Sequence, residues 1–358
     1  MAALLLTICV VNLNAQHYPV SQEVLRLSPE DNNPRNSEGD FVSLLDGRIM
    51  FVYSRYFGTS DSDHGAAVLA ARYSSDQGAT WTSQDRVIVE QEGRMNVMSV
   101  SLLRLQDGRI ALFYLRKNSV TDCIPMVRFS HDEGETWTEP VPIITDKAGY
   151  FVLNNNRVIQ LENGRLIMAV ARHHTPDGQW TDSADLYAYY SDDMGKTWHS
   201  SSKVPNKSNI ITQEPGLIEL KDGRILMYIR ASHGAQQFSY SEDNGASWSH
   251  IQRSAISSPL SPATIARIPN TKDLLLVWNN NPSSTLRTPL TAAISTDEGK
   301  TWKFLKNIED DPDGWYCYIA IHFTAGDVLL SYCAGSQSQK SHLNVTSIKK
   351  IPLEWFYK

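Results

Sequence analysis

The chain has 358 residues, of which 41% are hydrophobic, 20% charged and 9% aromatic. This is ordinary globular composition, and it excludes a disordered or collagen-like chain. Lys and Arg number 33 against 39 Asp and Glu, for a net charge of -6. Because binding to phosphate backbones needs a basic surplus, we expect no nucleic-acid partner. The four cysteines are too few and too scattered for a disulfide framework or paired zinc ligands.

The N-terminus has the pattern of a secretory leader. The apolar run Ala2–Val11 is too short to span a bilayer, which takes about 20 residues, and Asn-Ala-Gln at 14–16 offers a cleavage zone. A basic residue before the run is absent, and a buried first strand is the alternative interpretation. We expect residues 1–16 to be a signal peptide and the protein to be exported to the periplasm or the cell exterior. No later segment is apolar enough to cross a membrane.

Two short motifs alternate along the rest of the chain. The first, S-x-D-x-G-x-T/S-W, occurs five times, with its aspartates at Asp76, Asp132, Asp193, Asp243 and Asp297. The second, D/N-G-R-I/L, occurs at Asp46, Asp107, Asn163 and Asp222, with weaker versions near Asp273 and Gly326. Successive aspartates of the first motif lie 50 to 61 residues apart, so residues 17–358 divide into six units of similar length.

Each unit contains four predicted strands. In the first unit, Phe41–Leu45 and Ile49–Tyr53 flank an Asp-Gly turn, which is a strong hairpin signal, and Ala66–Tyr73 and Arg86–Val89 follow. Six such units predict one all-β domain, a six-bladed β-propeller with four-stranded antiparallel blades. A β-sandwich would not repeat both turns in this way. The sixth unit lacks the S-x-D-x-G motif, as expected where a ring closes on the N-terminal segment.

The topology predicts which face carries a site. If the strands of a blade are called A to D from the axis outward, both motifs lie on one face, and the B–C loops and D-to-A links lie on the other. The polar residues on that second face are Arg55, Asp61, Asp63, Asn96, Arg116, Arg172, His173, His174, Glu214, Arg230, Arg287, Tyr316 and Tyr318. His173 and His174 suggest a metal pair, but neighbouring strand residues point to opposite faces, so we expect no metal site.

The S-x-D-x-G motif resembles the Asp box of the sialidase (neuraminidase) superfamily, and the likeness, of the bacterial exo-sialidase kind, covers essentially the whole mature chain. It implies that the Asp-box aspartates are structural. It also implies roles for four residues: a base, Glu214 in T-Q-E-P-G; two carboxylate-binding arginines, Arg230 in M-Y-I-R and Arg287 in T-L-R-T-P; and a nucleophile, Tyr318 in W-Y-C-Y-I-A-I. Tyr316, two residues away and expected on the same strand face, is the alternative nucleophile.

The first blade departs from the family pattern. The resemblance implies an acid/base aspartate shortly after an arginine; Arg55 matches that arginine, and either Asp61 or Asp63 matches the aspartate, with Asp63 favoured by counting back from the strand. The position of the first carboxylate-binding arginine falls on Glu38. Arg35, three residues earlier, either takes that role or leaves the triad incomplete. Arg55, Asn96 and Arg116 are further candidates for substrate binding.

These residue types suit an anionic sugar. Guanidinium groups bind carboxylates in bidentate fashion and stay charged, while a neutral phenol approaches an anion without repulsion. We therefore expect an exo-glycosidase that hydrolyses terminal α-linked sialic acid with retention, as a monomer and without cofactor or metal. The alternatives are a hydrolase or lyase for another acidic sugar, which the departure at Glu38 motivates, and a non-catalytic carbohydrate-binding propeller.

Overall fold

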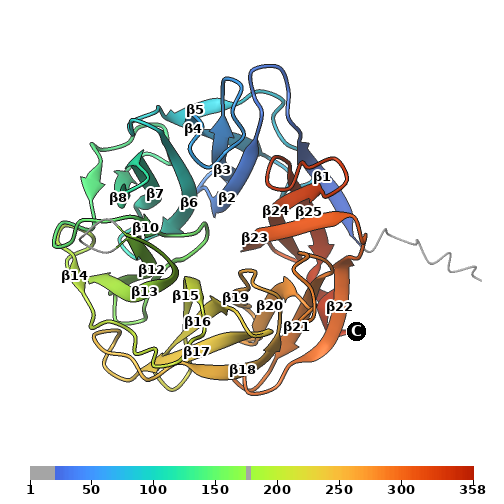
Figure 1. Ribbon diagram of the computed structural model, residues 1–358. Helices are drawn as coiled ribbons and strands as arrows, with labels where there is room; N and C mark the ends of the chain where they lie inside the picture. Colours follow the sequence, from blue (N-terminus) through green and yellow to red (C-terminus); the bar gives the residue numbers. More distant parts are fainter. Residues whose placement is uncertain (1–20, 175–178) are drawn as a thin grey trace, which may run out of the picture.

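The computed structural model describes residues 21–174 and 179–358. These residues form six antiparallel β-sheets that follow one another around a ring (Figure 1). The expectation of an all-β, six-bladed propeller is therefore confirmed. The signal peptide expected over residues 1–16 lies outside the described residues, so it stays a prediction.

The strands of each blade are numbered outward from the axis. The first blade consists of β2 (Asn36–Ser43), β3 (Ile49–Tyr56), β4 (Ala67–Ser74) and β5 (Arg86–Val89), and the second of β6 (Asn96–Arg104), β7 (Ile110–Ser119), β8 (Asp122–Ser130) and β9 (Val141–Pro142). In the third blade the inner strand is split into β10 (Phe151–Val152) and β11 (Val158–Gln160), and β12 (Leu166–His174), β13 (Trp180–Ser191) and β14 (His199–Ser200) follow. The fourth consists of β15 (Thr212–Glu219), β16 (Ile225–Ala231), β17 (Ala235–Ser241) and β18 (Gln252–Ser257), and the fifth of β19 (Thr264–Arg267), β20 (Leu274–Asn279), β21 (Leu290–Ser295) and β22 (Lys303–Glu309).

The sixth blade closes the ring. It combines β23 (Gly314–Phe323), β24 (Asp327–Ser336) and β25 (Thr346–Pro352) with β1 (Gln22–Leu27) from the start of the chain. β1 pairs antiparallel with β25, so the two ends of the chain share one sheet, as expected for a last unit without its own Asp box (Figure 1). The 3-10 helix η1 (Leu353–Tyr357) follows β25, and no helix among the described residues is long and apolar enough to cross a membrane.

The hydrophobic core lies between blades. Among the described residues, the buried apolar side chains fall into six clusters, and each cluster is shared by two neighbouring blades. Val52 of the first blade and Leu112 of the second, for example, are both fully buried in one of these clusters. Burial of both faces of every blade explains why the middle strands are continuous apolar runs.

The Asp boxes form tight turns that contact the neighbouring blade. Ser74 Oγ (2.8 Å), Thr80 N (2.8 Å) and Thr80 Oγ1 (2.6 Å) all donate to the Asp76 carboxylate, and the other Asp boxes repeat these three bonds. Gly245 has a φ of +90°, and a Cβ there would lie 2.2 Å from Ile167 Cδ1 of the preceding blade. Both facts support a structural role for the motif.

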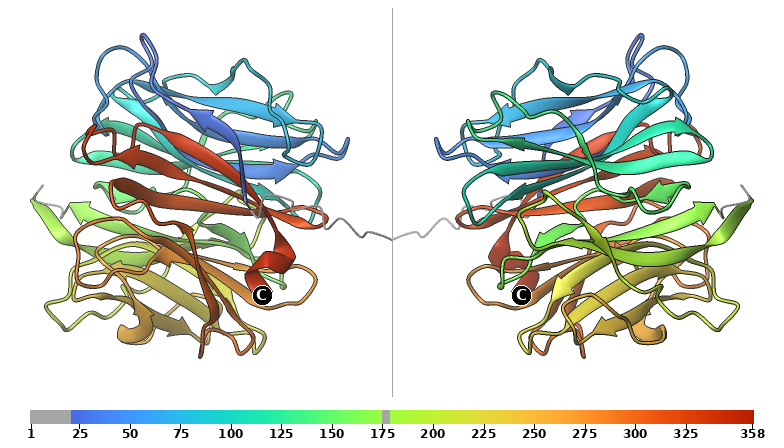
Figure 2. Two further views of the ribbon diagram at one scale, coloured as in Figure 1. Left: turned by 90° about the vertical axis from the view of Figure 1, so that its right-hand side faces the viewer. Right: turned by 90° about the vertical axis from the view of Figure 1, so that its left-hand side faces the viewer.

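The loops gather at the two faces of the ring, as the side views show (Figure 2). The Asp-Gly-Arg hairpins and the Asp boxes connect strands A–B and C–D, so they share one face. The B–C loops and the links between blades lie on the other face. The topology thus separates the structural turns from the segments that surround the mouth of the axis.

Asp40 connects three blades near the axis. Its Oδ1 accepts from its neighbour Phe41 N (2.8 Å) and from Asn156 Nδ2 of the third blade (2.9 Å), and its Oδ2 accepts from Leu102 N of the second blade (2.8 Å). The side chain is 2% exposed, so water does not replace these bonds. Asp40 therefore fixes the relative positions of the first three inner strands.

Replacing Asp40 by Ala should destabilise the fold. Each buried N–H left without a partner costs about 1–3 kcal/mol, so the free energy of unfolding should fall by at least that amount. Urea unfolding followed by tryptophan fluorescence measures it. The matched control is Asp46→Ala, at an exposed Asp-Gly-Arg turn, which should cost less than about 1 kcal/mol. Equal losses in the two variants would contradict the role of Asp40.

Candidate active site

Four inner strands carry a β-bulge near the axis. The pairing register shifts in β2, β6, β15 and β23, and the first unpaired residue of each shift has a positive φ: Glu38 (56°), Ser99 (60°), Glu214 (42°) and Tyr318 (56°). A bulge leaves a residue unpaired and re-aims its side chain, and bulges concentrate next to functional sites. All four side chains line one cavity.

This axial cavity has a volume of about 330 Å³ and receives residues from all six blades. Its lining consists of Glu38, Asp63, Met98, Ser99, Leu115, Lys117, Tyr150, Val152, Asn154, His173, Trp180, Gln213, Glu214, Arg230, Arg287, Tyr318 and Leu343. None of these residues belongs to an Asp box or to an Asp-Gly-Arg turn. The cavity therefore lies where the topology predicts a site, among the B–C loops and the blade links.

Tyr318 and Glu214 form the centre of the cavity. The Tyr318 hydroxyl donates to Glu214 Oε1 over 3.1 Å, and Arg230 Nη1 donates to Glu214 Oε2 over 2.6 Å. Burial by itself would raise the pKa of Glu214, but Arg230 and Arg287 outweigh it and hold that pKa below its usual value. Burial and the Glu214 carboxylate together raise the pKa of Tyr318 well above its usual range. At neutral pH the pair is therefore a phenol bonded to a carboxylate.

Three arginines surround this pair. Arg230 and Arg287 line the cavity, and the Arg287 guanidinium lies 5.4 Å from the centre of the Tyr318 ring. Arg35 lies behind the lining, 2% exposed, with its guanidinium 4.6 Å from the centre of the Tyr56 ring. Each of the three keeps one buried guanidinium nitrogen without a hydrogen-bond partner among the described residues. Because Arg230 and Arg287 line the cavity, their guanidinium groups can reach an anion there, whereas Arg35 lies behind the lining.

The region of Glu38 differs from a simple arginine triad. Arg35 Nη1 contacts Asp63 Oδ1 at 2.6 Å, and its Nη2 lies 3.7 Å from Glu38 Oε1. Ser99 Oγ donates to Glu38 Oε2 over 2.6 Å, and burial raises the pKa of Glu38. The link before β2 thus brings Arg35 to the site, while the bulge directs Glu38 into the cavity beside it.

Of the two candidate acids, only Asp63 lines the cavity. Asp61 is exposed, and its Oδ2 accepts from Asn344 Nδ2 over 2.9 Å, which connects the first blade to the sixth. The Asp63 side chain is also exposed, to 56%. Desolvation by the protein around it acts to raise its pKa, but Arg35 and, more weakly, Lys117 lower that pKa below its usual value. Asp63 is therefore ionised in the free protein at neutral pH.

Arg55 and Arg116, two of the expected binding residues, lie outside the lining of the cavity. Arg55 turns away from the axis, and its Nε pairs with Asp85 Oδ2 at 3.1 Å. Arg116 is not part of the lining, although its neighbours Leu115 and Lys117 are. Alternation along a strand explains this, because residues on either side of Arg116 point to the opposite face. The structure thus places Arg55 and Arg116 outside the lining of the axial cavity, and substrate binding by either residue stays a prediction.

Asn96 supports the site from behind. It is fully buried, and its Nδ2 donates to the backbone oxygens of Asp63 (3.0 Å) and Gly65 (2.8 Å). Lys117, which the sequence analysis missed, is 1% exposed and donates to the same Asp63 oxygen over 2.6 Å. Both residues hold the loop that carries Asp63, so they position it.

An aromatic wall is the second feature that the sequence analysis missed. The rings of His173 and Trp180 stack at 4.8 Å, and the Trp180 ring meets Tyr150 edge-on at 5.8 Å. Burial lowers the pKa of His173, so its ring is neutral at pH 7. Trp180 is 53% exposed although it is a large apolar residue. The sequence analysis already places His173 on this face of the propeller, but no motif indicates Tyr150 or Trp180.

Tyr316 does not share a face with Tyr318, contrary to expectation. The bulge at Tyr318 breaks the alternation of β23, and Tyr316 lines a different cleft. No group of three or more His, Cys, Asp or Glu side chains suited to a metal ion occurs in the described part of the chain, and the side chain of His174 is outside it. Tyr318 is thus the tyrosine placed beside Glu214.

Comparison with known proteins agrees with this architecture. Residues 50–345 match the model of the family described as the BNR repeat-like domain. The chain belongs to this family. The propeller is 27% identical to a sialidase of Clostridium perfringens over 271 residues, 66% of this chain and 66% of that protein. It is 28% identical to a sialidase of Paraclostridium sordellii over 271 residues, 66% of this chain and 63% of that protein.

Solved structures show the same fold. The Hadza microbial sialidase Hz136 superposes on the propeller with a TM-score of 0.74 at 19% identity, covering 90% of this chain and 66% of that one. The matched regions span slightly less than two thirds of the two clostridial relatives, so their full length extends beyond the match. The resemblance to the sialidase superfamily is confirmed, and the propeller is a BNR-repeat member of it.

Proposed function

We propose that this propeller hydrolyses terminal α-linked sialic acid from glycoconjugates with net retention. The observation that carries the proposal is the 3.1 Å hydrogen bond from Tyr318 to Glu214, placed next to Arg230 and Arg287. The family membership supports a sialidase-like glycosidase, and the two clostridial relatives are named sialidases. The nucleophile, the substrate and the stereochemistry are the parts that we propose.

The arginines supply the binding site for the sugar carboxylate. A sialic acid carries this group on its anomeric carbon, so the guanidinium groups of Arg230 and Arg287, with the charge of Arg35 behind the lining, would hold the reacting carbon close to Tyr318. A carboxylate nucleophile would meet repulsion there, roughly 4 kcal/mol for like charges about 4 Å apart at an effective dielectric near 20. The neutral phenol of Tyr318 avoids that cost.

Glu214 makes the phenol reactive. As the Tyr318 oxygen forms its bond to the anomeric carbon, the hydroxyl proton passes to Glu214 Oε1, with which it is already hydrogen bonded. The lowered pKa of Glu214 keeps it ionised and able to accept that proton at neutral pH. In the second step water replaces the tyrosine oxygen, and Glu214 returns the proton.

Asp63 is the proposed acid, although it is ionised in the free site. Its 2.6 Å contact with Arg35 is what keeps its pKa low. An entering carboxylate would share Arg35 and add a second negative charge nearby, and both effects raise the pKa of Asp63. Substrate binding would thus favour the protonated Asp63 that donates to the leaving oxygen, and the same group then activates water.

Glu38 keeps a second candidate reaction open. A buried carboxyl 3.7 Å from Arg35 narrows the space for a substrate carboxylate, which favours a hydrolase or lyase acting on a different acidic sugar. A panel of acidic glycosides separates the two candidates. Absence of turnover on every glycoside would leave the carbohydrate-binding alternative.

Export and a monomeric state remain predictions, which secretion assays and light scattering would test.

Removing the nucleophile or its base should abolish turnover. We expect Tyr318→Phe and Glu214→Ala each to lower kcat for a fluorogenic α-sialoside by at least about 10²-fold, because attack then lacks the oxygen or its proton acceptor. Tyr240→Phe and Glu242→Ala, at the Asp-box face, are the matched controls and should keep wild-type rates. A wild-type protein that is inactive on all sialoside linkages would contradict the proposal that the substrate is an α-linked sialic acid.

The effect of replacing Asp63 on turnover should depend on the leaving group of the substrate. Asp63→Asn is expected to reduce turnover of sialyllactose by about 10²–10⁴-fold, because the alkoxide leaving group needs a proton. An aryl sialoside, whose phenolate leaves more readily, should lose less. Steady-state rates on both substrates give the comparison. Equal losses, or a comparable loss in Asp61→Asn, would contradict the assignment.

The acidic side of the pH profile of kcat/KM should reflect the protonation of Glu214. In the wild type, kcat/KM should fall only when the pH drops below the usual glutamate pKa, since the arginines hold the pKa of Glu214 low. Arg230→Met removes one of these charges and should move the limb to higher pH by about 1–3 units. Arg230→Lys keeps the charge and should leave the limb in place. Identical limbs in all three proteins would assign the base to another group.

A further inference from the structure

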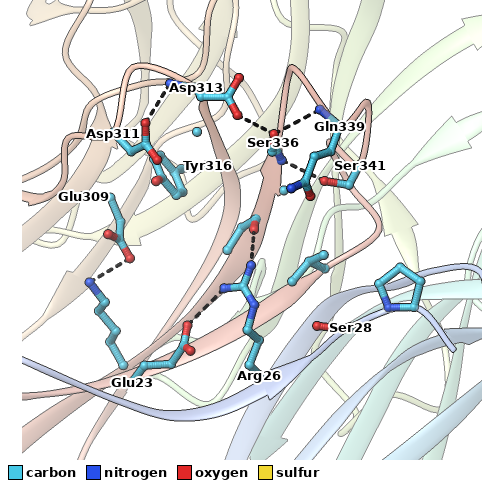
Figure 3. Close-up of a pocket in the computed structure, with 16 residues that line it drawn as sticks. Glu23, Arg26, Ser28, Glu309, Asp311, Asp313, Tyr316, Ser336, Gln339 and Ser341 are labelled. Carbon is cyan, nitrogen blue, oxygen red and sulfur yellow. Dashed lines mark hydrogen bonds and ion pairs between the residues drawn. The ribbon is translucent and has the colours of Figure 1, made fainter.

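A second and larger cleft, of about 830 Å³, opens where the fifth and sixth blades meet. Its walls come from the link between β22 and β23, from the loop after β24, and from β1 and the residues that follow it. Figure 3 shows Asp311 and Tyr316 on one side of the cleft and Gln339 and Ser341 on the other. The link and the loop belong to the same face of the ring as the mouth of the axial cavity.

Tyr316 presents an unused hydroxyl to this cleft. Its ring lies directly over Gly314, where a Cβ would be 2.3 Å from the hydroxyl oxygen, and it meets the Tyr332 ring edge-on at 6.1 Å. The residue is 7% exposed, and its hydroxyl makes no hydrogen bond to another described residue. Burial, Glu309 and Asp311 raise its pKa to about 12, so the group is a neutral hydrogen-bond donor.

The charges around the cleft are mainly acidic. Glu23, Glu309, Asp311 and Asp313 oppose Arg26 and Lys349, which leaves two negative charges in excess. Most of these groups are paired with one another: Lys349 Nζ lies 2.7 Å from Glu309 Oε1, and Arg26 Nη1 lies 3.2 Å from Glu23 Oε2. Such a lining disfavours an anion, so the cleft does not suit a second sialic acid.

Asp311 and Gln339 complete a set of polar groups that a ligand can use. One Asp311 oxygen accepts from Asp313 N over 2.9 Å, and the other has no partner in the described part of the chain. Gln339 is exposed at the opposite wall, with both an amide donor and an amide acceptor. The cleft thus offers a buried phenol donor, a free carboxylate oxygen and an amide, and these groups suit neighbouring hydroxyl groups on a sugar ring.

We propose that this cleft binds a neutral sugar unit, a hexose that presents adjacent hydroxyl groups to Tyr316, Asp311 and Gln339. The volume falls within the range of small-molecule sites. Ser341 and Val345 line this cleft while Leu343 of the same loop lines the axial cavity, so the two openings are neighbours. The proposal does not depend on catalysis in the axial cavity.

The test is binding of lactose, a neutral disaccharide, to the full protein by saturation-transfer NMR and calorimetry. We expect weak binding to the wild type and at least about fivefold weaker binding to Tyr316→Phe, since one hydrogen bond is lost. The melting temperature of Tyr316→Phe should not change, because its hydroxyl stabilises nothing in the protein. Asp311→Ala, on an exposed link, should weaken binding in the same way.

The control variant is Tyr318→Phe, which should keep lactose affinity while losing sialoside turnover. Failure of the proposed function would appear as an inactive wild type that still binds lactose at Tyr316. The cleft proposal is overturned if the wild type gives no saturation transfer, or if Tyr316→Phe and Asp311→Ala both bind lactose as the wild type does. Lactose binding lost in Tyr318→Phe would place the ligand in the axial cavity and also overturn it.

Discussion

The site depends on one backbone constraint, the bulge with a positive φ in the inner strands of four blades. A regular strand would alternate its side chains between the two blade interfaces, and few would face the axis. At Glu38, Ser99, Glu214 and Tyr318 the extra residue redirects the side chain into the axial cavity. Each of these non-glycine residues occupies a region that costs of order 1–3 kcal/mol, which the packed blades on either side sustain.

In the axial cavity, the charge states of Glu214 and Asp63 follow from the pairing of each carboxylate with an arginine. Arg230 keeps Glu214 ionised and oriented toward Tyr318, and Arg35 does the same for Asp63. In the proposed function a substrate carboxylate would interact with both arginines. A ligand that competed for them would raise the pKa of the paired acids, so binding and chemistry would be coupled through the same guanidinium groups.

The sequence was sufficient for the fold because the repeated turns are local chemistry that recurs in every unit. It also indicated Glu214 and Tyr318, through resemblance, and the two meet as expected. Side-chain direction was harder to predict. The sequence indicates Arg116 and not Lys117, because charge alone does not show which face a strand residue takes. Tyr316 is an alternative to Tyr318 in the sequence, because a bulge leaves no clear mark there.

The central claim is that Tyr318 forms a bond to the sugar, and a trapping experiment tests it most directly. A fluorinated sialosyl fluoride slows the breakdown of a glycosyl-enzyme, so the adduct survives for peptide mass spectrometry. The account predicts one adduct, on the peptide that contains Tyr318, and none in Tyr318→Phe. An adduct on another residue, or sialoside turnover in Tyr318→Phe at the wild-type rate, would contradict it.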